Sequence, residues 1–77
     1  MKGGVIMTEK ALLKVPEQCR HNIETLSSLI ETYKEKANVH MEHQCKNKLK
    51  GYLGCLTDMG IISEAESRCL YLYYATI

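Results

Sequence analysis

The chain has 77 residues, a formal net charge of +1 and 45% hydrophobic residues, with neither Trp nor Phe. This length allows one small domain, which buries little apolar surface and often depends on a disulfide, a metal or a partner chain. The near-neutral charge argues against a strongly basic nucleic-acid binder. Because no apolar run reaches the length of a membrane span or a signal peptide core, we expect a cytoplasmic protein that does not bind a membrane. Its four cysteines would then stay reduced.

The composition indicates an all-α protein, because Leu, Glu, Lys and Met outnumber β-branched residues and there is one proline. We expect a flexible N-terminus over residues 1–7 and a single helical domain over residues 8–77. Thr8 is placed to cap a short helix over residues 9–14, which ends near Val15 because Pro16 disfavours helical geometry in the residue before it. Pro16 itself fits the first turn of a second helix.

The middle of the chain carries an apolar stripe at helical spacing whose register changes near residues 38–40. It begins as Cys19, Ile23, Leu26, Ile30, Tyr33 and Ala37, and it resumes as Met41, Cys45, Leu49, Tyr52, Leu53 and Leu56. Charge placement favours a helix break at the change, because an acidic residue opens and lysines close each half, as two separate helix dipoles prefer.

Two arrangements therefore stay open. A break near Asn38 gives helices near 9–14, 16–37, 40–59 and 63–75, which form a small three- to four-helix bundle. Without the break, one helix over 16–59 would be about 66 Å long at about 1.5 Å per residue. Such a helix could not be covered by its own chain, so a chain with this long helix and a C-terminal helix would have to form a dimer.

The turn before the last helix has two independent signals. Gly60 can adopt the left-handed conformation that ends a helix, with Ile61 then touching Leu56. Ser63 and Glu66 have the spacing of a capping box that starts the next helix. We expect that helix to bury one face and to carry three further residues at its flanks; the face is Ala65, Cys69, Leu72 and Tyr73, and the flanks are Leu70, Tyr71 and Tyr74.

A helix, a glycine turn and a second helix also suggest a small DNA-binding regulator with a degenerate helix-turn-helix. Leu56, however, occupies a position where that motif usually has a small residue. Glu64 and Glu66 at the start of the second helix would repel phosphate. We therefore disfavour nucleic acid as a partner and keep this function as an alternative.

Cysteine and histidine cluster twice, as Cys19-x-His21 and as His40-x-x-His43-x-Cys45. These are zinc-ligand residue types, but neither cluster has the paired spacing of a zinc site. Cysteines on an apolar stripe usually act as small hydrophobic residues. A chain of this length has little room for an enclosed pocket. We therefore expect no metal, no cofactor, no catalytic residue and no enzymatic activity.

The C-terminal tyrosines predict an interaction surface, because they cannot all enter one small core and exposed tyrosine is typical of interfaces. We expect this surface to combine tyrosines with nearby basic residues, namely Tyr52, Tyr71, Tyr73, Tyr74, Lys46, Lys50, His40 and His43. Gly51 and Gly54 lie three residues apart in a predicted helix, which suggests close packing against another helix. A homo-oligomer, either a dimer or a higher assembly, is the simplest partner to propose.

The segment from Gly51 to Glu66, followed by Leu-Tyr-Leu-Tyr-Tyr, resembles short helical proteins of Firmicutes phages and integrative elements. The resemblance covers residues 49–77 and transfers no functional residue. It implies a setting in which small helical proteins often act by occupying a host target. We therefore expect a non-enzymatic interaction protein that self-associates and blocks a host macromolecule, such as a defence component. An oligomeric protein that sequesters a small anionic ligand, such as a signalling nucleotide, is the second alternative.

Overall fold

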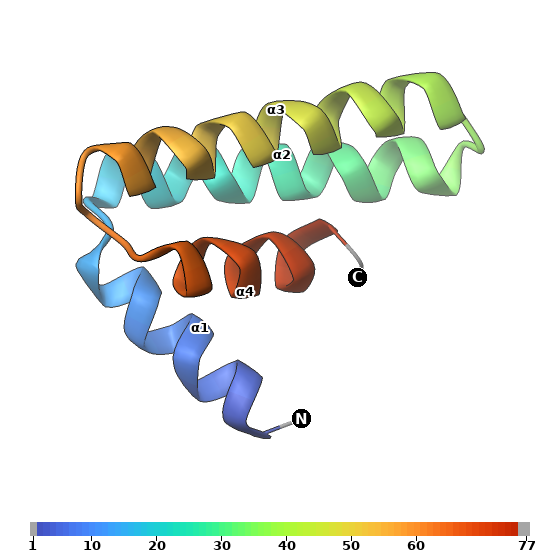
Figure 1. Cartoon of the computed structure of the whole chain (residues 1–77). Coiled ribbons are helices and arrows are strands. Elements are labelled where there is room, and N and C mark those ends of the chain that lie inside the picture. The colour runs from blue at the N-terminus through green and yellow to red at the C-terminus, as the bar shows by residue number, and fades with distance from the viewer. Residues whose placement is uncertain (1, 76–77) are drawn as a thin grey trace.

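The structure, a computed structural model, describes the backbone of residues 2–75 and the side chains of residues 8–75. Within that range the chain forms four helices, α1 (Lys2–Lys14), α2 (Glu17–Glu35), α3 (Val39–Asp58) and α4 (Glu64–Ala75). α2 and α3 form an antiparallel hairpin, α4 runs back along α3, and α1 packs against α4 (Figure 1). The prediction of a small all-α bundle is confirmed, and the alternative of one helix over 16–59 is wrong.

The first helix is longer than the sequence suggests. It begins at Lys2 rather than near residue 9, so Thr8 lies inside the helix and does not cap it. Thr8, Ala11 and Val15 are buried on one side of α1. Thr8 itself is buried in this packing, so its side chain faces the core rather than the start of a helix. The side chains of residues 1–7 lie outside the described part, so the flexibility of that segment stays a prediction.

The break between α2 and α3 is made without glycine or proline. Ala37 adopts a left-handed conformation with a φ of 57°. The Ala37 N–H donates to the Lys34 carbonyl at 3.1 Å and the Asn38 N–H to the Tyr33 carbonyl at 2.9 Å, which is the Schellman pattern of a helix end. The Asn38 side chain then caps α3 by accepting a hydrogen bond from the Met41 N–H at 3.2 Å.

The turn between α3 and α4 is as predicted. Gly60 has a φ of 75°, and the Ile61 N–H donates to the Leu56 carbonyl at 3.0 Å. The capping box is also present, because the Ser63 N–H donates to Glu66 Oε1 at 2.8 Å and the Glu66 N–H donates to Ser63 Oγ at 3.1 Å. These contacts fix the direction in which α4 leaves α3.

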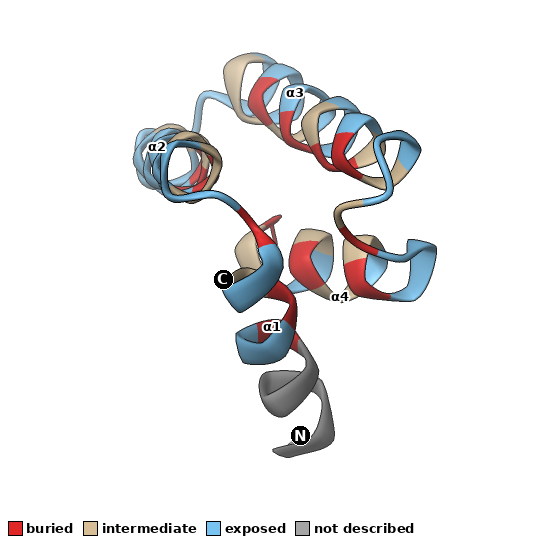
Figure 2. Cartoon of the chain, turned by 90° about the vertical axis from the view of Figure 1, so that its left-hand side faces the viewer, coloured by how far each residue is buried: buried red, intermediate tan, exposed pale blue. Residues whose placement is uncertain are grey.

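The core lies where the inner faces of the helices meet (Figure 2). Ile23, Leu49, Leu53 and Leu70 are fully buried at its centre. The predicted buried face of α4 is wrong, because Ala65 is exposed and Leu72 is 52% exposed, whereas Leu70 is inside. The physical reason is the burial of Leu70, which contributes more than an ion pair with an exposed lysine, and Glu66 on the same side pairs with Lys14 of α1 at 2.7 Å. Since Leu70 lies four residues further on, it shares the inward side of α4 with Glu66.

The predicted close packing at Gly51 and Gly54 is also wrong within this chain. A methyl group added at either glycine would meet no atom within 4 Å. Gly51 is exposed and Gly54 is half-buried. Both glycines lie in the interior of α3, where they leave open space beside the helix and admit no neighbouring helix of this chain.

Candidate interaction surface

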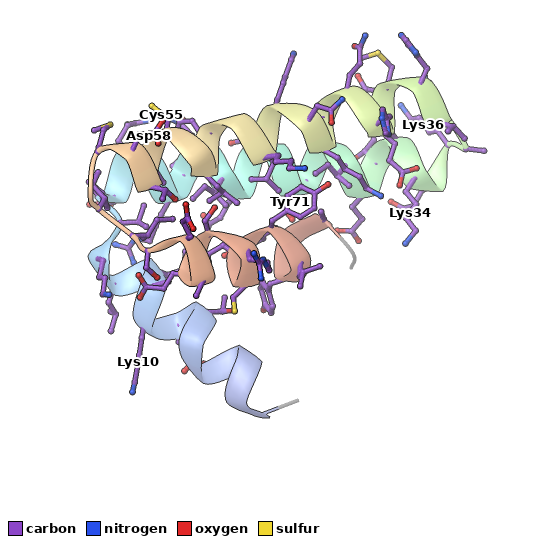
Figure 3. The ribbon with its side chains drawn as sticks, in the orientation of Figure 1. Lys10, Lys34, Lys36, Cys55, Asp58 and Tyr71 are labelled. Carbon is purple, nitrogen blue, oxygen red and sulfur yellow. The ribbon has the colours of Figure 1, made fainter. Side chains whose placement is uncertain are left out.

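A groove lies between α3 and α4, with a volume of about 380 Å³. Its lining, which we call the basic groove, consists of Lys50, Leu53, Glu64, Ser67, Arg68 and Tyr71. The spacing of these residues explains why they meet, since residues three, four and seven apart share one face of a helix. Leu53 is fully buried and forms the floor. Tyr71 lies in the space between α4 and α3 (Figure 3).

The two cations of the basic groove come from different helices. Lys50 of α3 and Arg68 of α4 are both exposed. Within residues 8–75, neither of them forms an ion pair, in contrast to Lys14, which pairs with Glu66, and Lys46, which pairs with Glu42. The groove therefore presents two cations without an ion pair in that range beside an aromatic ring, and Glu64 is the one carboxylate of its lining.

A basic stripe on α3 leads into the groove. His43, Lys46 and Lys50 stand at positions i, i+3 and i+7, so they share one side of the helix. A second, smaller recess on this side is lined by Val39, Glu42, His43 and Lys46. There the Lys46 ammonium pairs with the Glu42 carboxylate at 2.9 Å, which partly neutralises the outer end of the stripe.

Four residues of the predicted surface thus come together, namely His43, Lys46, Lys50 and Tyr71. Tyr52 lies elsewhere, since its hydroxyl accepts a hydrogen bond from Asn22 Nδ2 at 3.1 Å and joins α3 to α2. A hydrogen bond with the Cys19 side chain is the main cause that raises the pKa of Tyr52 above its ordinary value of 10.0. Tyr52 is therefore part of the α2–α3 contact.

The remaining three predicted residues, Tyr73, Tyr74 and His40, do not line the groove. Burial raises the pKa of Tyr74, whose carbonyl accepts a hydrogen bond from Ser27 Oγ of α2 at 3.4 Å. Tyr73 is 48% exposed, with its ring perpendicular to that of Tyr74 at 4.9 Å between centroids. His40 is exposed and its Nε2 lies 3.1 Å from Gln44 Nε2. The eight predicted residues therefore do not form one continuous surface.

The sequence reasoning missed Arg68, Ser67 and Glu64. A signal for them was present, because Glu64, Arg68 and Tyr71 follow the i, i+4, i+7 spacing of one helical face. This spacing does not stand out as long as Ala65, Cys69, Leu72 and Tyr73 are expected to form the buried face of α4. Once Leu70 is placed inward, these residues lie on the side of α4 that borders α3.

Metal ligands do not gather in the part of the chain that the structure describes. No three Cys, His, Asp or Glu side chains there are close enough to hold an ion. The four cysteines form no disulfide in that part. Among the described helices, none has both the length and the apolar character needed to cross a membrane.

The fold and the groove define a small four-helix protein with a basic recess between its last two helices. The chain matches no protein-family model, no curated protein and no solved structure.

Proposed function

We propose that this chain is a small, non-enzymatic helical interaction protein that binds and blocks a host macromolecule through the basic groove and the adjoining stripe. The resemblance of residues 49–77 supports a phage or mobile element as its setting, with a target such as a defence component inside the host cell. One observation carries the proposal: Lys50 and Arg68 line the same groove next to Tyr71, and neither forms an ion pair with any residue in the range 8–75.

The chemistry of these residues supports binding to a large partner. Arginine and tyrosine are enriched at interfaces and often dominate their binding energy. The groove is open, so a partner surface can reach Tyr71 and both cations together. Exposed cations also accelerate encounter with a negatively charged surface.

Affinity capture tests this function. The tagged protein is incubated with lysate of a Firmicutes host beside a Lys50→Glu/Arg68→Glu double variant and a Lys48→Glu control. Lys48 is exposed and lies two residues from Lys50, on another side of α3. We expect a specific partner to be retained by the wild type and the control and lost by the double variant. Retention of every captured protein by the double variant would contradict the proposal.

The groove also contains the groups that a small anionic ligand would use, since a nucleotide could place its phosphates between Lys50 and Arg68 and stack its base on Tyr71. This second candidate predicts heat of binding in calorimetry with a panel of nucleotides, and its loss in an Arg68→Glu variant. Silence across the panel would remove it.

A further inference from the structure

We infer that the basic groove binds an acidic segment of a partner protein, with a carboxylate held between Lys50 and Arg68. This inference rests on the proposed function and names the chemistry of the partner. Lys50 reaches the groove from α3 and Arg68 reaches it from α4, so a single acidic side chain can meet both cations. The guanidinium of arginine matches a carboxylate with two parallel hydrogen bonds.

The floor of the groove adds an apolar requirement. Leu53 is fully buried at its base and the Tyr71 ring is half-buried at its side. An apolar side chain next to the bound carboxylate would cover the exposed part of the Tyr71 ring and exclude water from the charge pair. The expected occupant is therefore a segment that alternates acidic and apolar residues, which is a pattern that peptides provide.

The arrangement of charge favours a peptide over a nucleic acid. Glu64 lines the groove together with the two cations, and Glu42 lies two helical turns before Lys50 along α3. A phosphate backbone carries negative charge at every unit and would be repelled at Glu64, whereas the Glu42 carboxylate is paired with Lys46. A peptide can place a neutral or basic side chain beside Glu64, so it can complement the whole pattern.

Fluorescence anisotropy with defined probes tests the inference. The probes are a short labelled peptide of glutamate and leucine, a short labelled duplex DNA and a labelled ATP. We expect the peptide to bind most tightly, and its affinity to fall as salt is added. Lys50→Glu and Arg68→Glu should each weaken peptide binding by about tenfold or more, because reversing either charge places a carboxylate against a carboxylate. The Lys48→Glu control should change peptide affinity by less than about twofold.

A second variant tests the role of Glu64. Glu64→Gln removes one carboxylate of the groove with little change of shape, so binding of duplex DNA should strengthen several-fold. Lys50, Glu64 and Arg68 are all exposed, and circular dichroism is expected to show unchanged helix content in each variant.

Three results would overturn the inference. The first is tighter binding of duplex DNA or ATP than of the peptide, the second is peptide binding that survives both charge reversals, and the third is the absence of peptide binding. In each case capture of a host partner through the groove can still succeed, so failure of this inference is distinguishable from failure of the proposed function.

Discussion

Ala37 is the residue at which local conformation and residue type disagree most clearly. Its φ of 57° lies in a region where a β-carbon is strained and where glycine is usual. A non-glycine residue in this region costs on the order of 1 kcal/mol or more. The hydrogen bonds at the end of α2 and the Asn38 cap hold it there.

Replacing Ala37 with glycine should therefore stabilise the protein. Relief of the strain exceeds the added flexibility of the unfolded chain, so we expect Ala37→Gly to raise the free energy of unfolding by about 0.5–1 kcal/mol. Urea unfolding followed by circular dichroism measures this change. The matched control is Ala65→Gly in the exposed first turn of α4, which should lower stability by a similar amount. A loss of stability in Ala37→Gly would contradict the left-handed conformation.

Glu66 combines three contacts at the start of α4. Its carboxylate accepts hydrogen bonds from the Lys14 ammonium at 2.7 Å and from the Ser63 N–H at 2.8 Å, and its own N–H is capped by Ser63 Oγ. The bond with Lys14 is the main cause that holds the pKa of Glu66 below its ordinary value of 4.5, with the Ser63 N–H next. The charged form of the Glu66 carboxylate therefore stabilises the folded protein above pH 4.5.

The Glu66→Gln variant measures how much the Glu66 charge contributes to the free energy of unfolding, because that contribution depends on pH. Glutamine can keep the cap but loses the charge, so we expect a loss of about 1 kcal/mol at neutral pH, modest because the Lys14 side chain is 54% exposed. A lowered folded pKa gives stability that is present above pH 4.5 and is lost as pH falls through the folded value. Denaturant unfolding should thus show the difference between the two proteins narrowing below pH 4.5. A difference that stays constant down to acidic pH would contradict this assignment.

In α3, the predicted close packing at two glycines is wrong, and substitution of these glycines tests the open space found there. Gly51 and Gly54 lie within this helix, and open space surrounds the position of an added methyl group. Alanine at either position should raise the free energy of unfolding by up to about 1 kcal/mol, because glycine is a poor helix former. Thermal unfolding would show an increase of about 4–8 °C per kcal/mol for a domain of this size.

Gly60 provides the contrast, since its φ of 75° disfavours any side chain. Gly60→Ala should lower stability by about 1 kcal/mol in the same assay. A loss of stability in Gly51→Ala would show instead that another helix approaches α3 closely at that point.

The end of α3 and the start of α4 are the features that the sequence predicts best. Short-range patterns determine them, so the cap at Gly60 and the capping box of Ser63 and Glu66 could be identified directly. The buried face of α4 could not be, because it depends on how α4 packs against α1 and α3, including the contact of Glu66 with Lys14, which lies 52 residues away in the sequence. The start of α1 at Lys2 is not predicted either, because Thr8 has the residue type of a cap but is buried inside the helix.

The same distinction applies to the basic groove. Tyr71 and Lys50 were predicted as surface residues from their types, but their meeting with Arg68 depends on how α4 packs on α3. Tyr52 and Tyr74 have the same residue type as Tyr71, yet both serve contacts with α2. Residue type alone therefore could not separate the tyrosines of the groove from those that join helices.

At the scale of the whole molecule, self-association stays a prediction. Tyr73 and its neighbour Leu72 support this prediction, because the Tyr73 side chain is 48% exposed and the Leu72 side chain is 52% exposed. We propose that this pair forms the contact between copies of the chain. Sedimentation equilibrium should show a mass above that of the 8.8 kDa chain which rises with concentration. A Leu72→Ser/Tyr73→Ser variant should sediment as a monomer, and a monomeric wild type at all concentrations would contradict the proposal.

We propose above that the protein binds its partner through the basic groove. Photo-crosslinking in host cells tests it most directly, with a photoreactive phenylalanine analogue placed at position 71 in the groove or at position 29 on the exposed side of α2. We expect a specific crosslinked partner from position 71, none from position 29, and loss of the adduct when Lys50→Glu/Arg68→Glu is added. An adduct from position 29 alone, or one from position 71 that survives the charge reversals, would contradict it.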